Sequence, residues 1–97
     1  MAKSIDAYVP PQNIDAEVSL LGSILLDKEA IVKVADLLGS SDFYKDAHRD
    51  IYESMVQLYE SREPIDVITL TSKLSDNKKL DQIGGSGYIT TLASSVP

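Results

Sequence analysis

Apolar residues recur at helical spacing along most of the chain, beginning near residue 14. The first apolar positions step by four, three and four residues, at Ile14, Val18, Leu21 and Leu25. This spacing places them on one face of a helix, and Asn13 or Asp15 can cap its start. Gly22 lies inside the segment, where glycine costs about 1 kcal/mol relative to alanine. Such a glycine is tolerable where another helix passes close to it.

A second helical segment follows Asp27-Lys28. It has Ile31, Val34, Ala35 and Leu38 on one face. Gly39 comes directly after this face and is placed to stop the helix in the left-handed conformation. The polar residues Ser40-Ser41-Asp42 are then predicted to form a turn or a cap.

Two further helices are separated by a proline. The third helix is predicted to run from about Asp46 to Ser61. Its inward residues are expected to be Ile51, Met55, Leu58 and Tyr59. Pro64 ends this region, because proline cannot donate a helical hydrogen bond, and Asp66 is a natural N-cap for the fourth helix. The inward residues of the fourth helix are expected to be Val67, Leu70, Thr71 and Leu74.

The last third of the chain is predicted to be short helices joined by polar and glycine-rich turns. Residues 75–79 form a polar loop, Leu80 to Ile83 can make one helical turn, and residues 84–87 form a sharp turn. A last short helix carries Tyr88, Ile89, Leu92 and Ala93, and Val96-Pro97 closes it. Because the chain has no strand alternation, the fold class is all-α, a compact single domain of five or six short helices. Residues 1–12, with Pro10-Pro11, are predicted to be a flexible N-terminal arm, and residues 13–97 the helical domain.

Composition narrows the class of protein. The 97 residues include 43% apolar and 25% charged residues and no cysteine, which is typical of one small globular domain that uses no disulfide. The longest apolar run is too short to span a bilayer, and the N-terminus lacks the apolar block of a signal peptide. We therefore expect a cytoplasmic protein.

The net charge of −6 is unevenly distributed. Residues 1–66 contain thirteen acidic and six basic residues, whereas residues 67–97 contain two acidic and three basic residues. An acidic domain repels phosphate backbones, so proteins are the more natural partners. The alternative is a small nucleic-acid-binding domain with Asp66–Leu74 and Tyr88–Leu92 as a helix-turn-helix. That motif needs exposed Lys or Arg at the start of its second helix, and residues 88–97 contain neither.

Candidate chemistry is sparse. Gly84-Gly85-Ser86-Gly87 lacks the Lys-Ser or Lys-Thr of a phosphate-binding loop, so a turn between helices is the better interpretation. His48 is the only histidine. Asp46 and Asp50 face other directions on a helix, so His48 is expected to be a packed residue making a structural hydrogen bond. We predict no catalytic residue, no metal ligand and no cofactor in this chain.

Four acidic residues step by four, four and three positions, at Asp42, Asp46, Asp50 and Glu53. They share one face if the helix is continuous, either as a solvated surface or as a docking patch for a basic partner. Tyr88 follows a glycine turn and is either a core tyrosine with a hydrated hydroxyl or a binding residue. The partner-binding candidates are therefore Tyr88, Asp46, Asp50 and Glu53.

Several short motifs occur together in one order. They are Pro10-Pro11-Gln12-Asn13-Ile14-Asp15-Ala16-Glu17 before Leu20-Leu21-Gly22, then Asp42-Phe43-Tyr44 before His48 and Ile51-Tyr52, then Pro64-Ile65-Asp66 before Thr69-Leu70 and Leu74, and finally Ile83-Gly84-Gly85 before Tyr88-Ile89, Leu92 and Val96-Pro97. Over about residues 9–97 this order resembles the N-terminal domain of bacterial replicative DNA helicases of the DnaB family.

The resemblance implies a compact helical head of a hexameric, ATP-driven helicase that encircles DNA at the replication fork. In that family the heads form a collar, a trimer of dimers, which binds primase in the primosome and in some bacteria touches the helicase loader. ATP and Mg²⁺ belong to the motor of the full-length protein. A helical hairpin follows the head in the family, and this chain stops at Val96-Pro97, where the hairpin would begin. The resemblance therefore implies an excised interaction domain without helicase activity, a monomer or weak self-associator that contacts primase and other helicase subunits.

Overall fold

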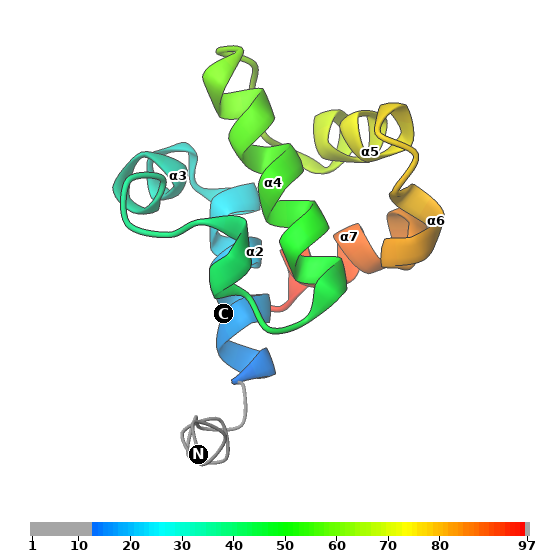
Figure 1. Ribbon diagram of the computed structural model, residues 1–97, viewed down its shortest axis with the longest axis horizontal. Coiled ribbons are helices and arrows are strands. Elements are labelled where there is room, and N and C mark those ends of the chain that lie inside the picture. The colour runs from blue at the N-terminus through cyan, green and yellow to red at the C-terminus, as the bar shows by residue number, and fades with distance from the viewer. Residues whose placement is uncertain (1–12, 97) are drawn as a thin grey trace, which may run out of the picture.

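The computed structural model describes residues 13–96 and confirms an all-α fold over them. These residues form six α-helices and one short 3-10 helix (Figure 1). The α-helices are α2 (Ile14–Leu26), α3 (Lys28–Val34), α4 (Asp46–Glu60), α5 (Val67–Asp76), α6 (Leu80–Ile83) and α7 (Gly85–Ser94), and the 3-10 helix is η1 (Ser40–Asp42). The predicted arm at residues 1–12 and the predicted closing residue Pro97 lie outside the described residues.

The longest helix, α4, lies at the centre of the fold. Figure 1 shows α3 on one side of it and α5 and α6 on the other. Helix α4 packs against α5 and α2, and α2 and α5 both pack against α7. The apolar core comprises Leu21, Ile24, Leu25, Ile31, Phe43, Ile51, Tyr52, Met55, Leu58, Leu70, Leu74, Ile83, Ile89 and Leu92. These residues come from every α-helix, so no helix is independent of the core.

Gly22 marks the closest approach between the first and last helices. A Cβ atom at this position would overlap the backbone carbonyl oxygen of Leu92 and lie 2.7 Å from Cγ2 of Val96. The expected close passage of another helix is confirmed, and that helix is α7. The glycine is needed here for space between backbones.

Three helix starts are capped by side chains of the expected kinds. Oδ1 of Asn13 accepts a hydrogen bond from the N–H of Ala16 at 3.0 Å, so Asn13 rather than Asp15 caps α2. Asp27 caps α3. Asp66 caps α5 by accepting from the N–H of Thr69, whose hydroxyl in turn accepts from the N–H of Asp66. This reciprocal pair is a capping box and fixes the direction in which α5 leaves the connecting segment.

The end of α3 differs from the prediction. The helix stops at Val34, and the chain tightens because the N–H groups of Leu37 and Leu38 both donate to the Val34 carbonyl. Gly39 is extended, with φ −106° and ψ 168°, so the predicted left-handed stop is wrong. The Tyr52 hydroxyl donates to the Leu38 carbonyl at 2.9 Å. The segment after α3 is therefore held by a tertiary hydrogen bond in addition to its own backbone bonds.

Two helix ends use a left-handed residue that is not glycine. After α4, the N–H of Arg62 donates to the Tyr59 carbonyl and the N–H of Glu63 to the Leu58 carbonyl, with φ of 59° at Arg62. After α5, Lys78 has φ of 60° in the same arrangement. Both are Schellman motifs, in which glycine is the usual left-handed residue. The side chain at each position therefore carries a conformational cost of about 1 kcal/mol.

The glycine-rich segment is less of a loop than predicted. Gly84 and Gly85 have φ of 112° and 77°, which confirms a sharp turn at these two residues. Ser86 and Gly87 are already helical, because α7 begins at Gly85. Likewise, Ser75 and Asp76 belong to α5 and not to the predicted polar loop. Helix ends are set by tertiary contacts as well as by local preference.

One predicted core residue lies at the surface. Tyr59 is 38% exposed, whereas Ile51, Met55 and Leu58 are buried as expected. Tyr59 is four residues from Met55 and one from Leu58, so it lies at the edge of the inward face of α4.

Among the described residues no helix is long and apolar enough to cross a bilayer.

Candidate functional site

Three polar side chains from three different helices meet beside the start of α4. Nδ1 of His48 lies 2.7 Å from Oε1 of Glu17, and Nε2 of His48 lies 2.6 Å from the hydroxyl oxygen of Tyr88. Glu17 comes from α2, His48 from α4 and Tyr88 from α7. We call these residues the polar triad. Their side chains link the first, central and last helices of the described fold.

Glu17 also binds the backbone that leads into α4. Lys45, the residue before α4, makes no side-chain cap. Instead the N–H of Tyr44 donates to Oε2 of Glu17 at 2.6 Å, and the N–H of Lys45 to Oε1 at 3.4 Å. These N–H groups belong to the two residues before α4, and a carboxylate beside a helix start also interacts favourably with the helix dipole.

The surroundings of Glu17 favour its ionised form. Burial alone would raise its pKa, but hydrogen bonds from the Tyr44 N–H, the His48 ring and the Lys45 N–H together lower the pKa below its ordinary value. Because an ionised carboxylate only accepts hydrogen bonds, Nδ1 of His48 carries a proton. In the neutral ring Nε2 is then the acceptor, and the Tyr88 hydroxyl donates to it.

The prediction of a packed, hydrogen-bonded His48 is confirmed. The residue has no exposed surface, and both ring nitrogens have partners within the protein. No substrate can reach a ring in this position, so the geometry favours a structural role over acid–base chemistry. Across residues 13–96 there is also no group of three or more residues placed to hold a metal ion.

Tyr88 combines the two alternatives that sequence left open. Its side chain is half-buried, and its hydroxyl bonds to His48. The ammonium group of Lys45 lies 4.9 Å from the centre of its ring, within the range of a cation–π interaction. A Cβ atom at Gly84 would lie 3.0 Å from Cβ of Tyr88, so the preceding turn holds this side chain closely. Only part of the Tyr88 ring is therefore accessible to a partner, and the ring is already held in one position.

The four predicted acidic residues do not form one continuous face. Asp42 lies in η1, and its carboxylate accepts from the N–H of Gly39, so it is not on α4. Asp46 is 93% exposed and pairs with Arg49 at 3.1 Å. Asp50 is only 21% exposed and contacts Lys79 and Gln82. Glu53 is exposed on α4.

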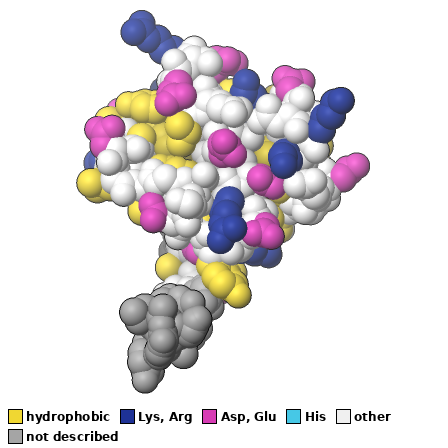
Figure 2. All heavy atoms as spheres, in the orientation of Figure 1, with side chains coloured by type: hydrophobic (Ala, Val, Ile, Leu, Met, Phe, Trp, Pro, Cys, Tyr) yellow, Lys and Arg dark blue, Asp and Glu magenta, His cyan; other side chains and the backbone are white. Residues whose placement is uncertain are grey.

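Of the predicted acidic residues, Asp46 and Glu53 are therefore the accessible ones on α4, while Asp50 ties α4 to α6 and the segment before it. Figure 2 shows acidic and basic side chains interspersed over the face in view, with an apolar patch on the side where Figure 1 places α3. Such a mixed surface is suited to protein contacts more than to a phosphate backbone.

Sequence reasoning missed Glu17 as the residue that organises this region. The signal was present in an indirect form. The side chain of Lys45, the residue before α4, has no acceptor atom and cannot cap the helix, so the N–H groups of Tyr44 and Lys45 that lead into α4 needed an acceptor from elsewhere in the chain. Which acidic residue supplied it could be decided only once α2 and α4 were placed side by side.

The fold and the site define a small all-α domain whose described residues offer surface contacts and a polar triad centred on the buried His48. Residues 9–97 match the family model of the DnaB-like helicase N terminal domain. The chain therefore belongs to this family.

Individual relatives agree with the family match. The chain is 37% identical over 97 residues to the replicative DNA helicase DnaB of Geobacillus stearothermophilus and covers 21% of that protein. It is 48% identical over 84 residues, 87% of this chain, to DnaB of Nostoc sp., covering 10% of that protein. The crystal structure of the N-terminal domain of DnaB helicase from Mycobacterium tuberculosis matches with a TM-score of 0.87 at 43% identity, over 91% of this chain and 63% of that one. The chain thus spans about a fifth or less of the length of these curated relatives.

Proposed function

We propose that this chain is the N-terminal interaction domain of a hexameric replicative DNA helicase in the bacterial cytoplasm. In this proposal the domain helps to organise the N-terminal collar and binds primase, and in some bacteria the helicase loader, during DNA replication. ATP and Mg²⁺ would act in the motor of the whole protein, and the role of this domain is to bind other proteins.

The match of residues 9–97 to the helicase N-terminal domain family is the observation that carries the proposal. The character of the surface supports it. The chain carries a net charge of −6, and Asp46 and Glu53 project from the central helix. A basic surface on a partner protein would complement these carboxylates, and the partly exposed ring of Tyr88 lies beside Lys45, the residue before the same helix. Tyrosine is enriched at the energetic centres of interfaces.

Titration of isotope-labelled domain with the C-terminal domain of primase tests the primase contact. We expect chemical-shift changes on the exposed side of α4 and around Tyr88. Asp46→Lys combined with Glu53→Lys should weaken binding, since a rim charge mainly affects association. Asp36→Lys is the matched control, because Asp36 is an exposed acidic residue in the turn after α3. Shifts confined to other surfaces would exclude both proposed contacts.

Sedimentation of the 97-residue chain tests its part in the collar. We expect these 97 residues to be a monomer or to self-associate weakly, more so at higher protomer concentration. A stable hexamer of this chain alone would contradict that expectation and would place the collar contacts within the head.

The helix-turn-helix alternative gains no support from the fold. Helix α6 lies between α5 and α7, so the two helices assigned to that motif are not consecutive. Helix α7 contains no Lys or Arg. The recognition helix of such a motif would thus meet DNA without a cation at its start.

A further inference from the structure

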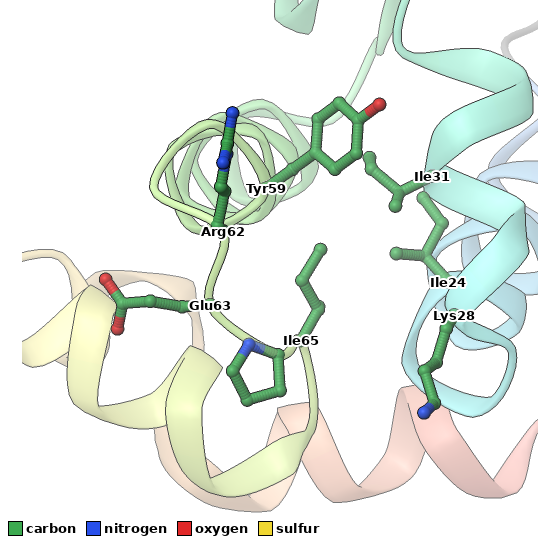
Figure 3. A pocket seen from close by; sticks show the side chains of 8 residues that line it. Ile24, Lys28, Ile31, Tyr59, Arg62, Glu63 and Ile65 are labelled. Carbon is green, nitrogen blue, oxygen red and sulfur yellow. The ribbon is translucent and has the colours of Figure 1, made fainter.

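A small apolar pocket opens between α2–α3 and the segment that joins α4 to α5. Its volume is about 220 Å³. Figure 3 shows that Ile24, Ile31, Tyr59 and Ile65 point toward a common space from both sides. The pocket is smaller than the roughly 300–1,000 Å³ of small-molecule sites. It therefore fits one apolar side chain better than a cofactor.

The rim of this pocket is cationic in a chain that is acidic overall. Lys28 and Arg62 line it, and neither forms an ion pair within residues 13–96. Glu63 also lines the pocket, but Figure 3 shows its carboxylate directed away from the apolar space. The whole chain has fifteen acidic and nine basic residues, whereas two basic residues and one acidic residue line this pocket, so the balance of charge is locally reversed.

Both cations stand where the fold itself favours other residues. Arg62 has a φ of 59° at the end of α4, a position that glycine occupies without strain. Lys28 is the first residue of α3, where a positive charge opposes the helix dipole. The stability of the fold therefore gives no reason for either charge, whereas an anionic partner would.

We propose that this pocket is a docking site for an acidic peptide segment of a partner protein. One apolar side chain of the segment enters the space between Tyr59, Ile31 and Ile65. Aspartate or glutamate side chains next to that anchor pair with Lys28 and Arg62. A buried anchor supplies most of the affinity, and the rim charges select acidic sequences.

This site is separate from the primase contact proposed above. Tyr88, Asp46 and Glu53 do not line the pocket. Loss of one interaction should thus leave the other intact, and the two proposals can fail independently.

Selection from a displayed library of random peptides on the immobilised 97-residue chain tests the proposal. We expect enriched sequences with one aromatic or aliphatic residue flanked by Asp or Glu. Chemical-shift mapping of one enriched peptide should place it against Ile24, Ile31 and Ile65. Enrichment of basic peptides, mapping to another surface, or no enrichment above a blank support would each overturn the proposal.

Arg62→Gly separates binding from folding. Removing the left-handed strain should raise the melting temperature. Losing the rim charge should raise the dissociation constant of the enriched peptide about three- to fivefold. Lys78→Gly is the matched control. Lys78 holds the same conformation after α5 and does not line this pocket. It should raise the melting temperature without changing peptide affinity, and equal affinity for both variants would contradict a role for Arg62.

Tyr59→Ala tests the apolar wall. Loss of a contact with the anchor side chain should raise the dissociation constant of the peptide about tenfold. Tyr44→Ala, which removes another exposed tyrosine, should have no effect. If self-association of the chain occurs and Tyr59→Ala abolishes it, the occupant is a second copy of this chain, and the peptide assignment is wrong.

Discussion

The two ends of α4 are built in different ways. At its start, the N–H groups of Tyr44 and Lys45, both ring nitrogens of His48 and the Tyr88 hydroxyl all find partners through the polar triad. At its end, the backbone closes on itself through the turn at Arg62, and the side chains around it border an open apolar pocket.

This difference separates residues that hold the fold from residues that are free to bind. At the start of α4 a change should appear mainly as a loss of stability, because polar groups lose their partners. At the end of α4 a change should appear mainly as a loss of binding.

Glu17→Ala should be the most damaging change at the start of α4. It leaves three donors without an acceptor, and one of them is on a fully buried ring. We expect a loss of about 2–3 kcal/mol in the free energy of unfolding, measured by urea denaturation. Glu53→Ala on the exposed side of α4 is the control and should change it by less than about 0.5 kcal/mol. Equal effects of the two variants would mean that the hydrogen bonds of Glu17 contribute nothing.

Acid should reproduce a smaller part of the same loss, because protonation keeps the shape of the Glu17 side chain. The pKa of Glu17 is lowered in the folded state, so the unfolded chain binds this proton more readily. The stabilisation is present above the unfolded-state pKa and is lost as pH falls through the folded-state pKa. Between about pH 7 and pH 3 the native chain should therefore lose more stability than Glu17→Gln. Parallel pH profiles in urea unfolding would contradict this.

Tyr88→Phe removes only the hydroxyl that donates to Nε2 of His48. The buried nitrogen is then unpaired, and we expect a loss of about 1–2 kcal/mol. Thermal unfolding followed by circular dichroism measures it. Tyr44→Phe is the control, because the Tyr44 side chain is exposed. A neutral Tyr88→Phe would show that water replaces the hydroxyl and that the triad is open.

The smallest effect should have the opposite sign. At the other end of α4, Arg62→Gly should increase the free energy of unfolding by about 0.5–1 kcal/mol, because glycine removes the left-handed strain. Lys78→Gly should give a similar gain after α5. If Arg62→Gly destabilises the chain, the arginine is a structural residue, and the contrast between the two ends of α4 is wrong.

The sequence predicted the helices well where the signal was local. Periodic apolar residues and the Asp66 cap placed α4 and α5 within one or two residues of their observed ends. It failed where a distant group intervened. Gly39 is extended, and the neighbouring Leu38 carbonyl is bound by Tyr52 from α4, a hydrogen bond that no local pattern contains.

In the candidate site, too, local features could be predicted from the sequence and distant partners could not. His48 could be predicted to be a packed residue because no second ligand exists near it, but its partners lie 31 and 40 residues away. The row of four acidic residues assumed a continuous helix from Asp42, and η1 interrupts it. The pocket at Arg62 could not be predicted at all, since its walls come from α2, α3, α4 and the segment before α5.

The packing of α2 against α7 has a consequence for synthesis of the protein on the ribosome. The backbone of α7 packs directly against Gly22, and Ile89 and Leu92 of α7 complete the core. A nascent chain that has not yet exposed α7 lacks these contacts and the Tyr88 partner of His48. Because non-local contacts form only after both segments are available, the domain should complete its fold only when α7 has left the exit tunnel. Translation at about 5–20 residues per second then sets a minimum waiting time of a few seconds between α2 and its partner helix.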